Sequence, residues 1–352
     1  MDQLISELAT KARKAGRSLA ASDYSTRVNA VLAIADALIQ RKAEILAANE
    51  LDISQAKESG MVESLIDRLL LTSERIDGIA HAARKVSQLP DPLHQTLRER
   101  TLENGLHLRQ VSVPFGVVGM IYEARPNVTV DASVILLMSG NAALLRGSAS
   151  AAHSNAKLIE IMKGALATTT ISPDVLQRVP SDDRNSVQAL LHARGKIDLV
   201  IPRGSAALIR MVVDEARVPT IETGAGVCHV YFDESADEKI AIPILINAKT
   251  QRPSVCNAAE TLLVHQARVK DLLPAALKAL HAAHVMLHCD ERSLAIASEL
   301  NIPATLATDE HFTTEYGVLE MNVAVVDSLE AASEHTSEFG TDRKSTRLNS
   351  SH

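Results

Sequence analysis

The segment of this sequence best suited to covalent chemistry surrounds Cys256. A polar, basic stretch precedes this residue, and an apolar run follows it at 259–264. A thiolate attacks carbonyl carbon atoms, and nearby cations or oriented backbone N–H groups favour the thiolate over the thiol. Lys249 and Arg252 could supply that electrostatic field. The residues also allow Cys256 to be a buried small hydrophobe, as single cysteines often are.

Two other polar residues occur where an apolar run meets a turn. Asn127 follows Pro126, and its amide could either cap the next helix or donate a hydrogen bond to a developing oxyanion. Glu222 precedes a glycine-containing turn at 223–226 that includes Gly224. A carboxylate there is either poised at the end of a strand or simply solvated.

Two short segments have the residue types that bind phosphate groups. They are Arg146-Gly147-Ser148 and Arg203-Gly204-Ser205. Each follows an apolar run and places glycine and a hydroxyl at the start of an expected helix, whose backbone N–H groups attract anions. The sequence contains no G-x-G-x-x-G fingerprint. Arg146 stands where an acid would bind the ribose 2′-hydroxyl of NAD, which favours a 2′-phosphate and therefore NADP.

Several cationic and hydroxyl side chains are candidates for binding a phosphate or carboxylate of the substrate. Guanidinium groups form paired hydrogen bonds with both anions. The residues alone do not assign these roles, because each arginine could equally form a surface salt bridge. The candidates are Arg125, Arg203, Lys249, Arg252 and Ser254.

The composition favours small-molecule ligands. The chain has 352 residues, of which 46% are hydrophobic and 22% charged, and its formal net charge is -7. This charge disfavours nucleic-acid binding, and 4 Tyr, 4 Phe and no Trp leave few rings to stack on bases. The length suggests two domains. No apolar run approaches the about 20 residues that cross a bilayer, so we expect no membrane span.

The three cysteines indicate neither a disulfide framework nor a metal site. Cys228, Cys256 and Cys289 lie far apart, with no C-x-x-C pair and no histidine at zinc-finger spacing. Cys228 and Cys289 stand within apolar runs, so we expect both to be buried. This cysteine usage fits a reducing cytoplasm.

The hydrophobic pattern predicts an α/β protein. Helical spacing over residues 3–90 predicts three opening helices, and alternation around Asn104-Gly105 predicts a two-stranded hairpin at 99–115. Short apolar runs then alternate with helical stretches, which is the pattern of parallel sheets covered on both faces. The predicted strands are 116–123, 142–146, 197–202, 218–222, 227–233, 259–265, 285–289 and 322–328, and the predicted helices include 129–139, 236–250 and 269–283. A domain boundary is expected near 223–227.

The last ten residues differ in composition from the rest of the chain. RKSTRLNSSH contains Arg343, Lys344 and Arg347 but no acid, and it shows no apolar periodicity. It resembles sequence joined to an interrupted gene, and such a segment is left out of fold prediction. We therefore expect a native chain that is interrupted near Asp342 and a non-native tail at 343–352.

Four long segments carry a resemblance to a known family. They are VPFGVVGMIYEARPNVTVDAS, SGNAALLRGSASAAHSN, IDLVIPRGSAAL and NAKTQRPSVCNAAETLLV. Taken in order, they closely resemble the gamma-glutamyl phosphate reductase (glutamate-5-semialdehyde dehydrogenase) family of the aldehyde dehydrogenase superfamily. The resemblance extends from residue 1 to about residue 340. It implies an α/β, aldehyde dehydrogenase-like fold of two Rossmann-like domains with a β-hairpin oligomerisation arm.

The resemblance also implies how the chain is divided. An NADP-binding domain would comprise residues 1–98 and 116–225, the oligomerisation hairpin 99–115, and a catalytic domain 226–342. The family continues with a stretch that returns to the cofactor domain and supplies a strand for oligomer assembly. The tail at 343–352 stands in its place, so we expect the catalytic domain to be incomplete at its C-terminus and the hairpin to lack that partner strand.

The activity that the resemblance implies is the NADPH-dependent reduction of L-glutamyl 5-phosphate to L-glutamate 5-semialdehyde and phosphate, the second step of proline biosynthesis from glutamate. Cys256 would be the nucleophile and Asn127 an oxyanion donor. Glu222 and Gly224 would lie at the cofactor site, and Glu222 would not be essential because phosphate, not water, exchanges with the acyl group. The other residues implied to bind NADPH are Arg146, Gly147, Ser148, Gly204 and Ser205.

The resemblance further suggests a homo-oligomer of the full-length form, and glutamate 5-kinase as a pathway partner. Acyl phosphates hydrolyse readily, which favours direct transfer from the kinase. Two alternative functions stay open. One is a CoA-acylating or other aldehyde dehydrogenase, which would not depend on phosphate. The other is a truncated, non-catalytic homologue that binds nucleotide or a partner. Neither nucleic acid nor a membrane is an expected partner.

Overall fold

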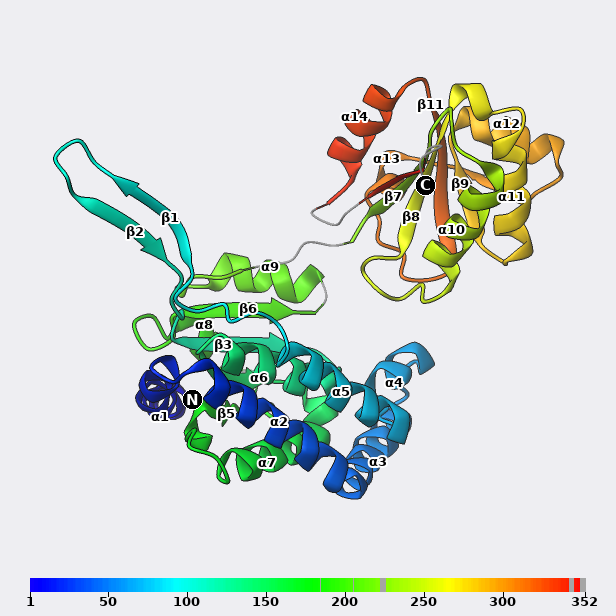
Figure 1. The fold of residues 1–352 in the computed structure, drawn as a ribbon. Helices are drawn as coiled ribbons and strands as arrows, with labels where there is room; N and C mark the ends of the chain where they lie inside the picture. Colours follow the sequence, from blue (N-terminus) through cyan, green and yellow to red (C-terminus); the bar gives the residue numbers. More distant parts are fainter. Residues whose placement is uncertain (184, 205, 222–225, 342–344, 349–352) are drawn as a thin grey trace. The chain divides into compact units, whose positions relative to one another are not determined.

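The chain forms two compact units in the computed structural model, Met1–Glu222 and Thr223–His352, here called unit 1 and unit 2 (Figure 1). The structure describes residues 1–183, 185–204, 206–221, 226–341 and 345–348. Each unit contains a parallel sheet and helices packed around it, which confirms the predicted α/β class. None of the described helices combines the length and apolar character that spanning a bilayer requires.

Unit 1 opens with five helices, where the periodicity predicted three. They are α1 (Asp2–Ala20), α2 (Tyr24–Gln40), α3 (Lys42–Glu58), α4 (Glu63–Leu69) and α5 (Ser73–Val86). Short polar turns with capping side chains separate some of them: Asp23 accepts a hydrogen bond from Thr26 N at the start of α2, and Thr72 accepts one from Arg75 N at the start of α5. Apolar periodicity continues across these short turns, so neighbouring helices could not be separated from the sequence alone.

An antiparallel hairpin follows, as the sequence predicted, and consists of β1 (Thr96–Thr101) and β2 (His107–Val111). Gly105 in its turn has a φ of +85°, a conformation that glycine adopts without strain. Every residue of both strands is exposed. The hairpin therefore projects from the remainder of unit 1 as an arm, drawn in cyan in Figure 1.

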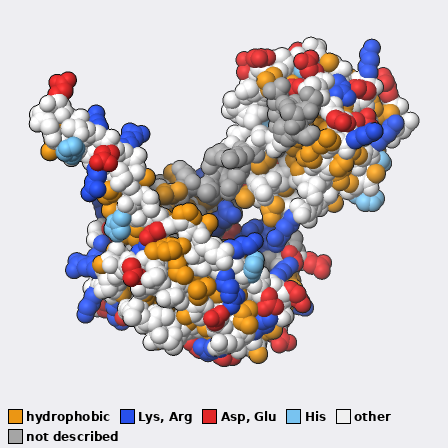
Figure 2. Space-filling view, in the orientation of Figure 1, with side chains coloured by type: hydrophobic (Ala, Val, Ile, Leu, Met, Phe, Trp, Pro, Cys, Tyr) orange, Lys and Arg blue, Asp and Glu red, His pale blue; other side chains and the backbone are white. Residues whose placement is uncertain are grey.

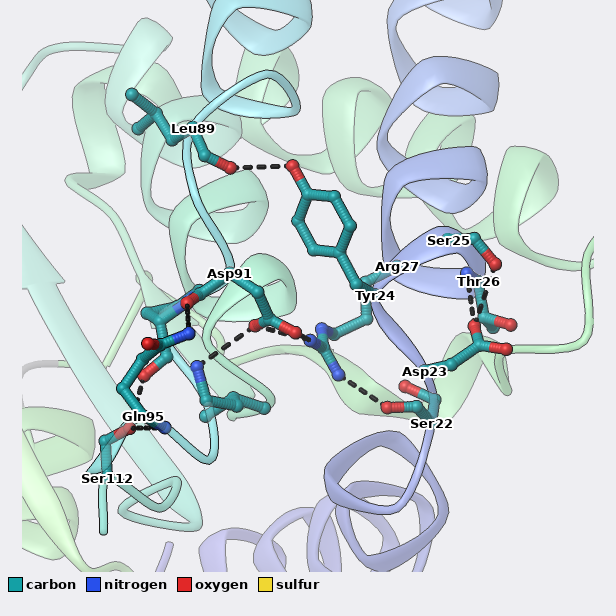
Figure 3. Close-up of polar contacts among 12 residues, drawn as sticks. Ser22, Asp23, Tyr24, Ser25, Thr26, Arg27, Leu89, Asp91, Gln95 and Ser112 are labelled. Carbon is teal, nitrogen blue, oxygen red and sulfur yellow. Dashed lines mark hydrogen bonds and ion pairs between the residues drawn. The ribbon is translucent and has the colours of Figure 1, made fainter.

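Polar contacts fix the base of this arm to α2 (Figure 3). Arg27 is buried, and its Nη2 donates to both oxygens of Asp91 at 2.7 and 2.6 Å. Asp91 Oδ1 also accepts a hydrogen bond from Leu93 N at 3.0 Å. On the other side of the base, Ser112 Oγ donates to Pro92 O at 2.6 Å. The segments that enter and leave the arm are thus tied to each other and to the helical core.

The parallel sheet of unit 1 has the strand order β5-β4-β3-β6. The strands are β3 (Val117–Tyr122), β4 (Ala142–Arg146), β5 (Leu176–Arg178) and β6 (Leu199–Arg203). The strand that comes first in the chain, β3, lies inside the sheet, so strands are added on one side of it and then on the other. Open α/β sheets bind ligands outside the carboxyl ends of their strands at such a switch point.

Two details of this sheet differ from the prediction. In the described part of the run at 218–222, Thr220 forms only an isolated bridge with Val200. The three-residue strand β5 was not predicted, because so short a segment carries too little apolar pattern. The remaining elements of unit 1 are α6 (Asn127–Met138), α7 (Ala152–Leu166), α8 (Asn185–His192), α9 (Ala206–Glu215), and the 3-10 turns η1 (Ala149–Ala151) and η2 (Pro173–Val175).

Unit 2 is built on a six-stranded parallel sheet with the order β10-β9-β11-β8-β7-β12. Its strands are β7 (Cys228–Phe232), β8 (Ala259–His265), β9 (Met286–Cys289), β10 (Thr305–Leu306), β11 (Glu320–Val326) and β12 (Thr346–Leu348). Its helices are α10 (Glu238–Thr250), α11 (Leu272–Ala282), α12 (Glu291–Glu299), α13 (Asp309–Phe312) and α14 (Leu329–Phe339), with the 3-10 turn η3 (Gln266–Arg268).

Side chains of the unit 2 strands alternate between two hydrophobic clusters. In β8, Leu262 and Val264 belong to the cluster that contains α11, whereas Leu263 belongs to the cluster with Phe312 and Ala332. Figure 1 shows α11 and α12 beside one face of this sheet and α14 beside the other. Successive residues of a strand point to opposite faces, so a continuous apolar run means that both faces are covered, as predicted.

The C-terminal tail contributes a strand to unit 2, which the sequence did not predict. Thr346–Leu348 forms β12, pairs in parallel with β7, and leaves Leu348 buried in the larger of the two clusters. Three residues are too few for a hydrophobic period to appear. An edge strand pairs through backbone groups that every residue except proline supplies, so pairing needs no distinctive sequence.

Candidate active site

A cavity of about 760 Å³ lies at the carboxyl ends of β3 and β4 in unit 1. Its position matches the crevice where open α/β sheets bind ligands, and its volume is typical of a small-molecule site. Side chains from the strand ends and from α8 and α9 line it. The polar ones include Glu123, Arg146, Ser148, Ser181, Asn185 and Gln188.

Arg146 and Ser148, both predicted to bind the cofactor, line this cavity. Arg146 is the last residue of β4, where its Nε donates to Ser186 Oγ at 3.2 Å and its Nη2 to Ser181 O at 3.4 Å. These contacts hold the guanidinium at the cavity wall. Ser148 Oγ accepts a hydrogen bond from Ser150 N and caps the short turn η1.

Gly147 and Gly204 allow close packing beside the cavity. A Cβ on Gly147 would lie 2.1 Å from Asn155 Nδ2. A Cβ on Gly204 would lie 2.6 Å from Glu123 Cδ. Both glycines are therefore explained by packing within unit 1. The other three predicted cofactor residues, Ser205, Glu222 and Gly224, lie outside the described residues.

Cys256 lies in unit 2 on the turn that connects α10 to β8. Its side chain is half-buried, whereas Cys228 and Cys289 are buried, as predicted. Cys228 Sγ donates to the carbonyl oxygen of Cys256 at 3.7 Å. Gly226 packs against the same carbonyl, since a Cβ on Gly226 would lie 1.8 Å from that oxygen. The backbone at Cys256 therefore packs so closely against residue 226 that only glycine fits there.

The polar residues that precede Cys256 have different surroundings. Arg252 is exposed and Ser254 is half-buried, so both positions are compatible with ligand contact. Lys249 is 0% exposed, and its Nζ lies 2.6 Å from Glu260 Oε2. Because protein encloses this ammonium and a carboxylate pairs with it, the structure argues against the predicted contact between Lys249 and substrate.

Asn127 begins α6 in unit 1, and its Nδ2 donates to Asp131 Oδ2 at 2.9 Å. The amide is thus engaged with a side chain one turn later, not with the N–H groups at the helix start. An amide nitrogen carries two hydrogens, so its second one can serve a ligand. Burial raises the pKa of Asp131, although the hydrogen bond from Asn127 opposes this shift. Arg125 and Arg203 are half-buried in the same unit.

Three carboxylates near these residues were not predicted from the sequence: Asp131, Glu260 and Glu315. Asp131 could have been found, because a spacing of four residues puts it on the same helix face as Asn127. Glu260 stands in an apolar strand, where a carboxylate is rarely buried unless it is paired. Glu315 accepts a hydrogen bond from Gly226 N at 2.8 Å, across 89 residues of sequence, and no local pattern indicates that contact.

The chain thus combines a crevice at the carboxyl ends of the strands in unit 1 with a half-buried thiol on a turn in unit 2. The model of the aldehyde dehydrogenase family matches residues 2–298. The chain belongs to the aldehyde dehydrogenase family. An acetylating aldehyde dehydrogenase from Geobacillus thermoglucosidasius shares this fold, with a TM-score of 0.67 and 17% identity over 99% of this chain and 81% of that one.

Closer relatives narrow the group. The chain is 50% identical over 331 residues to gamma-glutamyl phosphate reductase of Thermobifida fusca, which covers 94% of this chain and 78% of that protein. It is 48% identical over 335 residues to the reductase of Kineococcus radiotolerans, with coverages of 95% and 78%. The crystal structure of the Thermotoga maritima reductase superposes with a TM-score of 0.91 at 39% identity, over 98% of this chain and 82% of that one. Within its family the chain belongs with the gamma-glutamyl phosphate reductases, which confirms the resemblance.

Proposed function

We propose that this chain catalyses the NADPH-dependent reduction of L-glutamyl 5-phosphate to L-glutamate 5-semialdehyde and phosphate, the second step of proline biosynthesis from glutamate. The observation that carries the proposal is the placement of Cys256. Of the three cysteines, it is the one that is not buried, and it lies on a turn beside a buried strand. Relatives at 50% and 48% identity are named gamma-glutamyl phosphate reductases, which supports the proposal.

The Cys256 thiolate acts on the carbon that is reduced. It attacks the acyl carbon of the substrate, so a C–S bond forms and the carbonyl oxygen becomes negative in a tetrahedral species. This species collapses to the thioester as the C–O bond to phosphate breaks and phosphate leaves with the bonding electrons. Hydride addition to the thioester carbon then gives a thiohemiacetal oxyanion. When this species collapses, the C–S bond breaks, the aldehyde leaves, and the thiolate is regenerated. A thiol suits both halves because it displaces phosphate and its thioester accepts hydride.

Asn127 and the backbone N–H of Cys256 are the proposed donors to the oxygen that becomes negative. The same oxygen carries the charge when phosphate is displaced and when hydride adds, so the donors act twice. Donors that are oriented before the reaction stabilise such charge most effectively. The 2.9 Å contact with Asp131 fixes the amide of Asn127 in advance, which supports this role.

A nicotinamide cofactor follows from the family, and we propose NADPH as the form used and the unit 1 cavity as its site. When bound, NADPH supplies the hydride. The volume of about 760 Å³, the switch point of the sheet and the guanidinium of Arg146 at the cavity wall all suit a phosphorylated dinucleotide. Ser148 adds a hydroxyl at the same wall. The roles of Ser205, Glu222 and Gly224 rest on the resemblance alone.

Arg125, Arg203, Arg252 and Ser254 are proposed to hold the anionic groups of the substrate. Arg252 is the best supported, because it is exposed on the cysteine turn, where the acyl phosphate must bind. We also propose a homo-oligomer joined through the arm. Glutamate 5-kinase is the proposed partner that transfers the unstable acyl phosphate directly to this enzyme.

The direct test is Cys256→Ser, assayed in the reverse direction as phosphate-dependent oxidation of glutamate 5-semialdehyde with NADP. Loss of a catalytic nucleophile lowers kcat by about 1,000-fold or more, and we expect at least that loss. Cys289→Ala removes a buried thiol and serves as the matched control, with activity expected to follow the folded fraction. A folded Cys256→Ser variant with undiminished turnover would contradict the proposal.

The acyl acceptor distinguishes the remaining functions. We expect oxidation of the semialdehyde to require phosphate and to be unaffected by CoA. Turnover with CoA but without phosphate would identify a CoA-acylating enzyme instead. Binding of NADPH, measured by its fluorescence, with no turnover with either acceptor would identify a non-catalytic homologue.

A further inference from the structure

A fully buried ion pair stands at the two ends of the turn that carries Cys256. Lys249 lies in the last turn of α10, and Glu260 is the second residue of β8. Their side chains are both 0% exposed, and Lys249 Nζ lies 2.6 Å from Glu260 Oε2. The ion pair therefore closes the base of the cysteine turn, residues 250–259.

The same two residues also contact a second loop of unit 2. Glu260 Oε1 accepts a hydrogen bond from Gly317 N at 3.5 Å. Lys249 Nζ lies 6.0 Å from the centre of the Tyr316 ring, a distance at which a cation is attracted to an aromatic face. Tyr316 is in turn held by a hydrogen bond from its hydroxyl to Asn322 Oδ1 at 2.7 Å.

This second loop also contacts Gly226, the residue that packs against Cys256. Glu315, adjacent to Tyr316, accepts a hydrogen bond from Gly226 N at 2.8 Å. Gly226 is the residue that packs against the Cys256 carbonyl. The cysteine turn is consequently held at its base by the ion pair and beneath Cys256 by Gly226, and one loop connects the two supports.

Stability alone does not account for a buried charge pair at this place. Burial lowers the pKa of the Lys249 ammonium and raises the pKa of the Glu260 carboxyl to about 7, while the pairing opposes both shifts. Well-packed apolar residues of similar volume are often as stabilising as a buried ion pair, or more so. Apolar contacts have no preferred geometry. The charged groups, in contrast, favour one alignment of the end of α10 against the start of β8.

We infer that Lys249 and Glu260 are positioning residues, whose ion pair sets the conformation of the turn at 250–259 and thereby aims the Cys256 thiol at the acyl carbon. This inference rests on the proposed role of Cys256 as nucleophile. Neither residue touches substrate. The pair acts through the backbone of the turn.

The decisive variant is the double replacement Lys249→Met/Glu260→Leu, which removes both charges and preserves much of the buried volume. We expect a melting temperature close to that of the original chain, because no unpaired charge is left in the core. We expect kcat to fall by about tenfold to a hundredfold with little change in KM, since small displacements of a reacting group have effects of that size. The rate of Cys256 alkylation by iodoacetamide should fall in parallel, and the buried Cys228 and Cys289 add little signal.

Two further variants keep the test decisive. Glu260→Asp retains both charges but withdraws the carboxylate by one methylene, and we expect the same fall in kcat at unchanged KM. Arg27→Met/Asp91→Asn removes the ion pair at the base of the arm and also the hydrogen bond from Arg27 to Ser22 O, so we expect it to lower the melting temperature without slowing alkylation. Normal kcat and normal alkylation in both Lys249→Met/Glu260→Leu and Glu260→Asp would overturn the inference and leave the pair a purely structural one.

The Cys256→Ser variant separates this inference from the proposed function. Its loss of alkylation identifies Cys256 as the labelled thiol. If Cys256→Ser keeps its activity, the proposed nucleophile is wrong. If Cys256→Ser is inactive while the ion-pair variants are normal in rate and labelling, the proposed nucleophile stands and the positioning role is wrong.

Discussion

At the scale of single residues, the candidate active-site groups are held by partners before any ligand binds. Asn127 donates a hydrogen bond to Asp131, and Arg146 donates hydrogen bonds to Ser186 and Ser181. The backbone of Cys256 packs against Gly226. Reactive groups held in this way need little reorganisation during the reaction. The sequence suggested the reactive groups themselves, but not these partners.

The role of Asn127 can be measured by replacing it with alanine. Removing one oxyanion donor typically lowers kcat by about 100- to 1,000-fold, and we expect Asn127→Ala to fall in that range. The assay is the phosphate-dependent oxidation of glutamate 5-semialdehyde, with far-ultraviolet circular dichroism to check folding. Ile135→Ala, on the exposed side of the same helix, is the control. Normal turnover in a folded Asn127→Ala variant would exclude the amide from the mechanism.

At the scale of elements, a buried carboxylate joins two helices that are far apart in the sequence. Asp52 in α3 is fully buried and lies at the start of α7. Its carboxylate accepts hydrogen bonds from His153 N at 3.1 Å and from Ser154 N at 2.8 Å. It also contacts His153 Nδ1 at 2.9 Å. Asp52 therefore caps α7 from another helix.

Removal of this cap should weaken unit 1. We expect Asp52→Ala to lower the free energy of unfolding by about 1–3 kcal/mol, because two helix N–H groups lose a buried acceptor. Urea unfolding followed by circular dichroism measures the change. Asp36→Ala removes an exposed ion pair with Arg84 and should cost less than about 1 kcal/mol. Equal effects of the two substitutions would show that Asp52 is not an important cap.

The elements show what a single sequence can reveal. β4 and β8 were predicted at the residues where they occur, because continuous apolar runs bounded by turns are a strong local signal. β5 and β12 were missed, since three residues carry no period. The run at 218–222 has the composition of a strand, but in its described part, 218–221, Thr220 forms a single isolated bridge. Pairing depends on a neighbour that the local sequence does not specify.

In the candidate site too, the features set by local sequence were predicted and those set by tertiary contacts were not. Cys256 and Asn127 were singled out from residue type and local context, and the resemblance to a family gave them roles. Lys249 was one of the candidates for the cationic field near Cys256 and for binding a substrate phosphate, because it belongs to the polar, basic stretch that precedes this cysteine. The structure instead buries it against Glu260, a partner on the next strand, and a contact of that kind depends on tertiary packing.

At the scale of the whole molecule, the arm is the feature that a single chain does not explain. Every residue of β1 and β2 is exposed, and Figure 2 shows hydrophobic side chains beside acidic and basic ones along it. Near its base, Leu97, Val113 and Phe115 are 61%, 65% and 63% exposed. Exposed apolar side chains near the base of an anchored hairpin suit a surface that another subunit covers.

We therefore expect the proposed homo-oligomer to depend on these side chains. Leu97→Ser/Phe115→Ser exposes less apolar surface without touching the Arg27–Asp91 contact that anchors the arm. Light scattering coupled to size exclusion should show a smaller mass for this variant than for the original chain at the same micromolar concentration. Val62→Ser changes a side chain that is 60% exposed elsewhere in unit 1, and it should leave the mass unchanged. An original chain that is already monomeric, or a double variant of unchanged mass, would show that the arm does not join subunits. β1 and β2 pair with each other along one edge, so the outer edge of each strand offers backbone groups with which a partner can pair.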